Sequence, residues 1–224
     1  MAITVRFFGL LLITSVLLGC THVSQRPSFN ISPKEGVDPF NAVTIMGDMD
    51  VRIDTSQSFY DVAVTSGEGD LKTITMTVKN HQLFLKRAHD FSHDKMSVVI
   101  YTPRLDKFTY SGAGNAYINH IRAHNLRVRV LRQGFVTLSG RAKELQATVT
   151  GHGRLNARCL YADTVYVNTT GLGQAEVRNI NGLSALAAGY SDIYYYQDPH
   201  GKFPYLRGSG TVLRMVGLQH CSIT

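Results

Sequence analysis

Six copies of a short glycine-containing segment constrain the fold of this chain more than any other feature. The first copy, residues 110–116, reads Tyr-Ser-Gly-Ala-Gly-Asn-Ala. Aligned on the second glycine position, successive copies are 20, 19, 20, 18 and 19 residues apart; the later copies are residues 131–136, 149–155, 169–175, 187–193 and 206–212. Recurrence at a nearly fixed period predicts a repeat architecture.

Apolar residues keep one register around each glycine segment. In the first copy Phe108, Tyr110, Ala116 and Ile118 stand six and four places before and two and four places after the second glycine, and the equivalent positions of later copies are also apolar or small. Each repeat therefore offers two half-buried strands around a corner that glycine permits. Stacked in parallel, such units form a parallel β-helix with turns of about 18–20 residues. A β-sandwich is the alternative, but it does not require a common register.

The segments before the repeats also predict strands. Alternating apolar residues begin near Phe40 and recur at residues 49–53, 61–65, 74–78, 83–85 and 96–101, whereas helical spacing is almost absent. We therefore expect an all-β protein, with the β-helix domain spanning residues 40–224.

The first residues have the pattern of an export signal. Arg6 precedes a mostly apolar run from Phe7 to Leu18, which is too short to span a bilayer. Leu17-Leu18-Gly19-Cys20 resembles the bacterial lipobox. This resemblance implies that residues 1–19 are removed, that Cys20 is acylated, and that Thr21, which is not aspartate, favours an outer-membrane destination in a Gram-negative cell. We predict a lipid-anchored protein of the cell envelope.

The segment after the lipid anchor and the two remaining cysteines lead to separate expectations. Residues 20–39 contain Pro27, Pro33 and Pro39 and predict an extended tether. Cys159 and Cys221 would lie about three turns, or roughly 14 Å, apart in the stack, which is too far for a disulfide unless the tail folds back. We expect two unpaired thiols.

The basic residues of the chain are unevenly distributed. The formal net charge is +7, and between residues 122 and 158 a single acid, Glu144, stands among Arg122, Arg127, Arg129, Arg132, Arg141, Lys143, Arg154 and Arg158. This basic band could face anionic lipid, acidic polysaccharide or nucleic acid. Alternatively, it could be a solvated surface that discourages strand-edge pairing.

Several of these elements resemble the GIN domain family, which is described as an auto-transporter adhesin head. They are Phe40-Asn41-Ala42-Val43, residues 47–51, Gln82-Leu83-Phe84-Leu85, Pro103-Arg104-Leu105 and the Ser-Gly-x-Gly corners. The resemblance covers about residues 40–212 and implies a right-handed, single-stranded parallel β-helix in exported or lipid-anchored bacterial proteins, without an established activity. The chain departs from the family pattern at residues 133–135 and 189–191, where a corner glycine is missing.

Candidate chemical sites are few. His89 and His93 lie with two aspartates in one six-residue segment and are weak metal-ligand candidates; a polar surface loop is the favoured interpretation, because a loop would not fix their geometry. The glycines at 171 and 173 precede a strand, not the helix of a nucleotide-binding motif. A polysaccharide lyase or hydrolase on a β-helix scaffold would need paired carboxylates, which the repeat alignment does not bring together. We expect no catalytic residues and no cofactor.

Two sets of residues are candidates for a ligand surface. Arg127 and Arg129 alternate with inward positions, and Tyr194 and Tyr196 are expected outward if Tyr195 is inward; the tyrosines could equally cover the end of the stack. We therefore predict a non-catalytic, adhesin-like binding or structural module. Its expected partners are an anionic glycan or an envelope protein, together with the membrane through its lipid, and not nucleic acid.

Overall fold

The computed structural model describes residues 28–29, 37–66, 73–88, 96–197, 201–217 and 221. Within these residues the secondary structure consists of strands, without an α-helix. The predicted lipidation site Cys20, nearly all of the tether, and the candidate metal ligands His89 and His93 lie outside the described residues. The strands are β1 (Ser28–Phe29), β2 (Ala42–Met46), β3 (Asp50–Asp54), β4 (Asp61–Thr65), β5 (Ile74–Lys79), β6 (Gln82–Arg87), β7 (Ser97–Tyr101), β8 (Lys107–Gly112), β9 (Asn115–Arg132), β10 (Phe135–Val149), β11 (Arg154–Gly171), β12 (Gln174–Gly189), β13 (Asp192–Tyr196), β14 (Gly201–Gly208) and β15 (Thr211–Met215).

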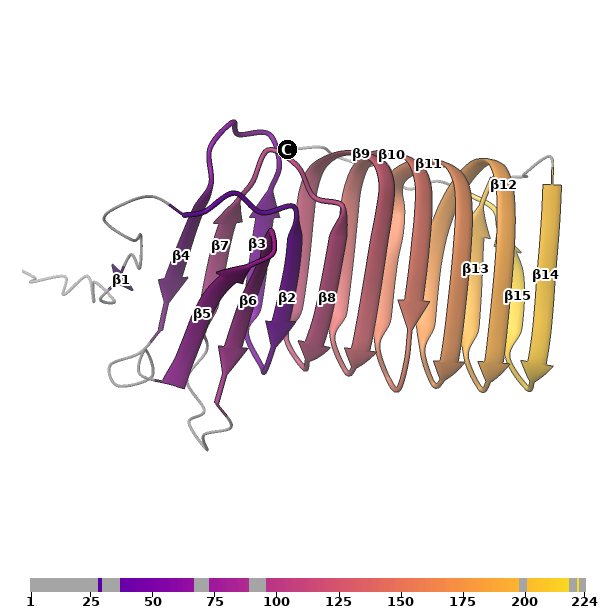
Figure 1. The fold of residues 1–224 in the computed structure, drawn as a ribbon. Coiled ribbons are helices and arrows are strands. Elements are labelled where there is room, and N and C mark those ends of the chain that lie inside the picture. The colour runs from indigo at the N-terminus through magenta and orange to yellow at the C-terminus, as the bar shows by residue number, and fades with distance from the viewer. Residues whose placement is uncertain are drawn as a thin grey trace, which may run out of the picture.

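The strands from β8 onward wind into a parallel β-solenoid, as Figure 1 shows. Strand β9 pairs with β8 and β10, β10 with β11, β11 with β12, and β12 with both β13 and β14, all in parallel. Partners such as Val130 and Val149, or Asp192 and Thr211, are 19 positions apart in the chain. The predicted parallel β-helix and its turn length are confirmed, and the β-sandwich alternative is wrong.

Each coil has two flat faces joined by a glycine corner at one edge and a smooth bend at the other. We call the strand segments that lead into a corner the first face, and those that follow it the second face. In Figure 1 the first face is toward the viewer, with the corners at the bottom and the bends at the top. Strand β9 therefore contributes to both faces, and the bend lies within it.

The first coils are not stacked in sequence order. Strand β2 lies between β6 and β8, and β3 lies between β7 and β9, all in parallel. The outermost strands β6 and β7 then pair with β5 and β4 in antiparallel orientation. These antiparallel strands supply hydrogen-bond partners to an edge that would otherwise be open to strand addition.

A side-chain contact between His120 and Asp54 joins the first coils to β9. The imidazole Nδ1 of His120 lies 3.0 Å from a carboxylate oxygen of Asp54, which also accepts a hydrogen bond from the Ser56 backbone N–H. Burial alone would raise the pKa of Asp54, but the hydrogen bonds from Ser56 and His120 outweigh it and hold this pKa below its ordinary value. The ionised carboxylate therefore stabilises the junction between the coils.

The core follows the apolar columns read from the sequence. Phe108, Tyr110, Ala116 and Ile118 are fully buried, and so are their counterparts in later coils, including Val128, Val130, Val136 and Leu138. Continuous burial of one column against the next is the main stabilising contribution in a stack of this kind.

The corners keep their shape even where a glycine is missing. Arg132 occupies the first glycine position of its corner with a φ of 73°, close to the 70° and 76° of Gly151 and Gly171 on the next coils. In the corner before β13, Ser191 replaces the second glycine, and its buried hydroxyl bonds the Thr169 hydroxyl at 2.9 Å. Backbone pairing between coils therefore imposes the left-handed conformation on Arg132 despite its steric cost.

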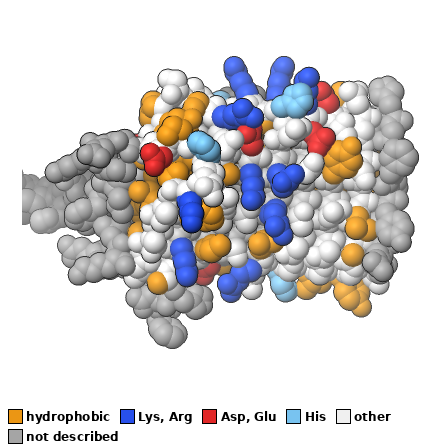
Figure 2. Space-filling view, viewed as in Figure 1, with side chains coloured by type: hydrophobic (Ala, Val, Ile, Leu, Met, Phe, Trp, Pro, Cys, Tyr) orange, Lys and Arg blue, Asp and Glu red, His pale blue; other side chains and the backbone are white. Residues whose placement is uncertain are grey.

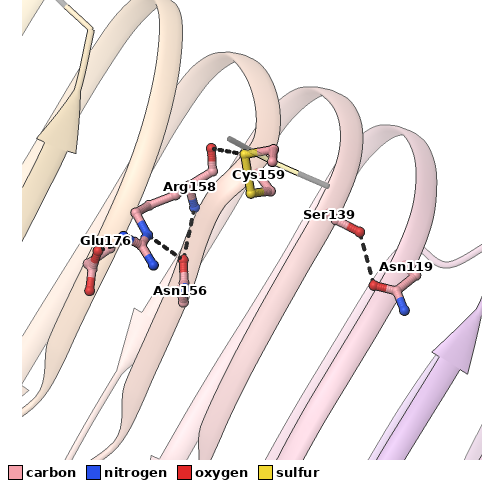
Figure 3. Close-up of a disulfide and its surroundings, with 7 residues drawn as sticks. Asn119, Ser139, Asn156, Arg158, Cys159 and Glu176 are labelled. Carbon is pink, nitrogen blue, oxygen red and sulfur yellow. Dashed lines mark hydrogen bonds and ion pairs between the residues drawn. A yellow bond between two sulfur atoms is a disulfide. The ribbon is translucent and has the colours of Figure 1, made fainter. Parts of the chain in front are cut away.

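The expectation of two free thiols is wrong, because Cys159 and Cys221 form a disulfide with a Cα–Cα distance of 5.4 Å. Figure 3 shows the disulfide at the bend of β11, beside Arg158, whose carbonyl oxygen lies 3.8 Å from the sulfur of Cys221. The estimate of 14 Å assumed that both cysteines belong to the stack. Cys221 follows the last strand, β15, and instead lies back against the coil of β11.

Candidate functional site

The predicted arginines Arg127 and Arg129 lie on the first face, in the part of β9 that leads into its corner. Parallel register places Arg127 between Lys107 of β8 and Gln146 of β10, and Tyr166 of β11 follows Gln146. A second row contains Thr109, Arg129, Thr148 and Asn168. Within each row, successive residues lie on neighbouring coils, about 4.8 Å apart. We call the two rows together the arginine face.

A shallow depression of about 610 Å³ lies in the arginine face, lined by residues of β9, β10 and β11. On its floor the Arg127 Nε donates to the Gln146 side-chain oxygen at 3.1 Å, and the Gln146 amide donates to Glu144 at 2.5 Å. Arg127 is thereby oriented by a neutral amide. Its terminal guanidinium nitrogens stay available to a ligand, and so does the whole head group of Arg129.

Neither arginine of this face forms an ion pair with a described carboxylate, although the Glu144 carboxylate lines the same depression. Arg127 and Arg129 are exposed, and among the described residues neither has a carboxylate within 4.0 Å. Figure 2 shows Lys and Arg side chains gathered over the middle and the upper margin of this face, with few acidic side chains between them. This part of the surface therefore favours anionic ligands electrostatically.

Tyr166 adds an aromatic surface that the choice of candidate residues missed. Its side chain is 47% exposed and lines the same depression as the two arginines. The repeat alignment contains the signal for it, because Val167 stands in an inward column and its neighbour must therefore point outward. An exposed tyrosine beside cations is a common arrangement in sugar recognition.

The predicted tyrosines do not join this surface. Tyr194 and Tyr196 belong to β13 on the second face, so the structure separates them from Arg127 and Arg129. Tyr194 is only partly exposed, and its hydroxyl donates to Asp192 at 3.4 Å. The four residues therefore do not form a single ligand surface.

Tyr196 keeps its place in the alternation, beside Arg178, but it is not an exposed ligand residue. Its side chain is 7% exposed, and its hydroxyl donates to Glu176 at 3.0 Å. Burial, followed by the bond to Glu176, raises the pKa of Tyr196. Tyr195 pairs with the buried Val177 and packs beside the core, as the alternation predicts. The neighbouring Arg158 and Glu176 side chains cover Tyr196.

The described residues offer little for catalysis or metal binding. They contain no group of three His, Cys, Asp or Glu side chains placed to hold a metal ion. Cys159 is oxidised and is therefore not a nucleophile. Within the same residues, no helix is long and apolar enough to cross a bilayer.

Comparison with known proteins agrees with the fold and the repeats. Residues 39–199 match the family described as "Putative auto-transporter adhesin, head GIN domain", and the chain belongs to this family. No curated protein matches the chain. The resemblance to the GIN domain family noted in the sequence is thereby confirmed.

Solved structures of similar fold include three bacterial proteins. A protein described as a putative adhesin from Bacteroides fragilis is 21% identical, with a TM-score of 0.63 over 80% of this chain and 94% of its own. From Parabacteroides distasonis, another putative adhesin is 20% identical (TM-score 0.51, 84% and 96% covered), and a "putative lipid binding protein" is 16% identical (TM-score 0.53, 80% and 94% covered). At these identities the similarity establishes the fold alone.

Proposed function

We propose that this protein is a lipid-anchored, adhesin-like module of the cell envelope that binds an acidic polysaccharide on its arginine face without catalysis. One observation carries the proposal. Arg127 and Arg129 form an exposed cationic pair on a sheet, with the half-buried Lys107 in register beside Arg127 and the exposed Tyr166 in the same depression. Neither arginine forms an ion pair with a described carboxylate, and the Glu144 carboxylate that lines the depression accepts from Gln146.

The residue types of the two rows match the parts of an acidic sugar chain. Arginine donates paired hydrogen bonds to carboxylates, Tyr166 can lie against the C–H face of a sugar ring, and Thr148 and Asn168 can bond hydroxyl groups. Because these side chains stand on paired strands, their spacing is fixed before a ligand arrives, and binding costs little conformational entropy.

Membership of a family described as adhesin heads supports an envelope location. The lipobox-like sequence ending at Cys20 supports anchoring by lipid. Replacement of this residue, Cys20→Ser, should move the protein from the membrane fraction to the soluble fraction, and an unchanged membrane fraction would contradict the lipid anchor. Thr21 after the cysteine favours the outer membrane, which separation of inner and outer membranes by density would test.

The ligand class can be tested with polygalacturonate as the polyanion and dextran as an uncharged polymer. Wild-type protein should bind polygalacturonate with an affinity that falls steeply as salt increases, because the attraction is between exposed charges. The Arg127→Glu/Arg129→Glu variant should bind at least about tenfold more weakly, since each charged hydrogen bond contributes about 1.5–3 kcal/mol.

A matched control lies on the second face. Arg52→Glu/Arg154→Glu changes the net charge by the same amount at two exposed positions and should leave binding within about threefold of wild type. Equal losses in the two variants would mean that net charge alone attracts the polymer, and no loss in either would exclude the arginine face. The same incubations, assayed for new reducing ends or unsaturated products, test the alternative of a polysaccharide lyase or hydrolase.

A further inference from the structure

A second hollow lies over the bends of the solenoid, apart from the arginine face. It consists of two adjoining depressions of about 540 and 530 Å³, which share Arg122, Arg141 and Tyr161. We call it the bend groove; its lining residues are His120, Ile121, Arg122, Ala123, His124, Gly140, Arg141, Ala142, Lys143, Tyr161, Asp163 and Ile180. The Lys and Arg side chains along the upper margin of Figure 2 lie over these bends.

Like charges stand directly opposite each other in this groove. Parallel register pairs Arg122 of β9 with Arg141 of β10, and Tyr161 of β11 follows on the next coil. Two positions further along these strands, Lys143 and His124 line the same groove. Like charges at directly opposed positions destabilise a sheet, because the side chains are only about 5 Å apart at their bases.

The fold does not neutralise this charge. Arg122, Arg141 and Lys143 are exposed, and among the described residues none has a carboxylate within 4.0 Å. One acid, Asp163, lines the groove. An anion bound between the two opposed guanidinium groups would convert their repulsion into charge-assisted hydrogen bonds.

Beneath the groove, a further arginine holds Tyr161 in place. The guanidinium carbon of Arg178 lies 4.1 Å from the centre of the Tyr161 ring, within the range of a cation–π interaction. The Nε of Arg178 is buried without a hydrogen-bond partner, and no described carboxylate forms an ion pair with this residue. Its charge therefore adds to the positive potential of the groove, and its contact fixes the orientation of the ring.

The remaining lining is apolar and small. Ala123, Ala142 and Ile180 leave room beside Tyr161 for a body larger than a simple ion. An aromatic ring with neighbouring apolar surface suits the C–H face of a pyranose, and the Asp163 carboxylate can accept from its hydroxyl groups.

We propose that the bend groove binds a single sugar acid. Its carboxylate lies between Arg122 and Arg141, and its ring lies against Tyr161. This site goes beyond the polysaccharide-binding function proposed for the arginine face and does not depend on it, because the two surfaces share no residue.

Titration with glucuronate, followed by calorimetry or by amide chemical shifts, tests the site directly. Wild-type protein should bind glucuronate and not glucose, which lacks the carboxylate. The Arg122→Gln/Arg141→Gln variant should lose at least about tenfold in affinity. Arg52→Gln/Arg154→Gln, which removes the same charge from exposed positions on the second face, should bind glucuronate as wild type does.

A melting-temperature measurement tests whether the groove variant is folded and whether Arg122 and Arg141 repel each other. Without ligand, Arg122→Gln/Arg141→Gln should melt at the same temperature as wild type or higher, because two opposed charges are removed. Absence of glucuronate binding, or equal binding by wild type and the groove variant, would overturn the proposal. Inorganic phosphate binding as tightly as glucuronate would overturn the sugar assignment, because the ring would then contribute nothing.

Discussion

The hydroxyl of Tyr110 links two coils at the first corner, and its removal should show how much that corner contributes to stability. The side chain is fully buried; its hydroxyl donates to the Met49 carbonyl at 2.8 Å and accepts from the Gly114 N–H at 2.8 Å. Tyr110→Phe keeps the ring and leaves both backbone groups without this partner. At about 1–3 kcal/mol for each of the two unsatisfied groups, unfolding should require about 2–6 kcal/mol less free energy.

The same hydroxyl gives an independent alkaline signature. Burial raises the pKa of Tyr110 to about 12 from an ordinary value of 10.0. Because the folded-state pKa is the higher one, the contribution to stability is complete below pH 10 and is lost as the pH rises toward 12. A shift of this size corresponds to about 3 kcal/mol at about 1.4 kcal/mol per pH unit.

Urea unfolding between pH 7 and pH 12 measures both effects, with Tyr166→Phe as the control at an exposed position. At pH 7 Tyr110→Phe should be clearly less stable than Tyr166→Phe, and the gap between Tyr110→Phe and wild type should narrow above pH 10. A pH 7 loss below about 0.5 kcal/mol, or a gap that does not change with pH, would refute the reasoning, since both follow from one buried hydroxyl.

Three further changes test other parts of the fold. Cys159→Ser removes the disulfide to Cys221, which closes a loop of 62 residues, and should lower the free energy of unfolding by about 4 kcal/mol. Urea unfolding measures this loss, and reduced wild-type protein should be as stable as the variant. Asp54→Asn should lower the melting temperature most above pH 3.8, and the difference from wild type should shrink as the pH falls further, because the folded protein holds the Asp54 pKa below 3.8. Gly134→Ala places a methyl group into the Tyr110 ring and should lower the melting temperature far more than Gly182→Ala, whose new atom would meet only a Thr164 side chain at 3.4 Å.

The inward half of the structure could be predicted because folding alone determines it. Each apolar column in the sequence, such as the one through Tyr110 and Val130, corresponds to a row of buried side chains, and the period of the corners corresponds to the pairing offset between coils. The stack also explains why Arg132 can replace a corner glycine, since pairing on both sides fixes its backbone.

The failures occur where the chain leaves the stack. Cys221 follows the last strand, so a spacing counted in turns could not place it. Tyr196 is the last residue of β13, and it is buried because the Arg158 and Glu176 side chains lie against it, which alternation along the strand does not predict. Likewise, the repeats begin after β7, so they carry no information on the antiparallel pairing of β4 with β7 and of β5 with β6.

Outward positions carry the information about function in this molecule, because they are free of the packing constraint. Simple solubility would be served by alternating charges, which also stabilise neighbouring strands. Instead, Lys107 lies opposite Arg127 on the first face, and Arg122 lies opposite Arg141 at the bend. If these pairs served only solubility, replacing one arginine of each pair with glutamate would add an attraction at no functional cost. We expect such variants to be more stable and to bind anionic sugars more weakly; a gain in stability with unchanged binding would return the basic band to the role of a solvated surface.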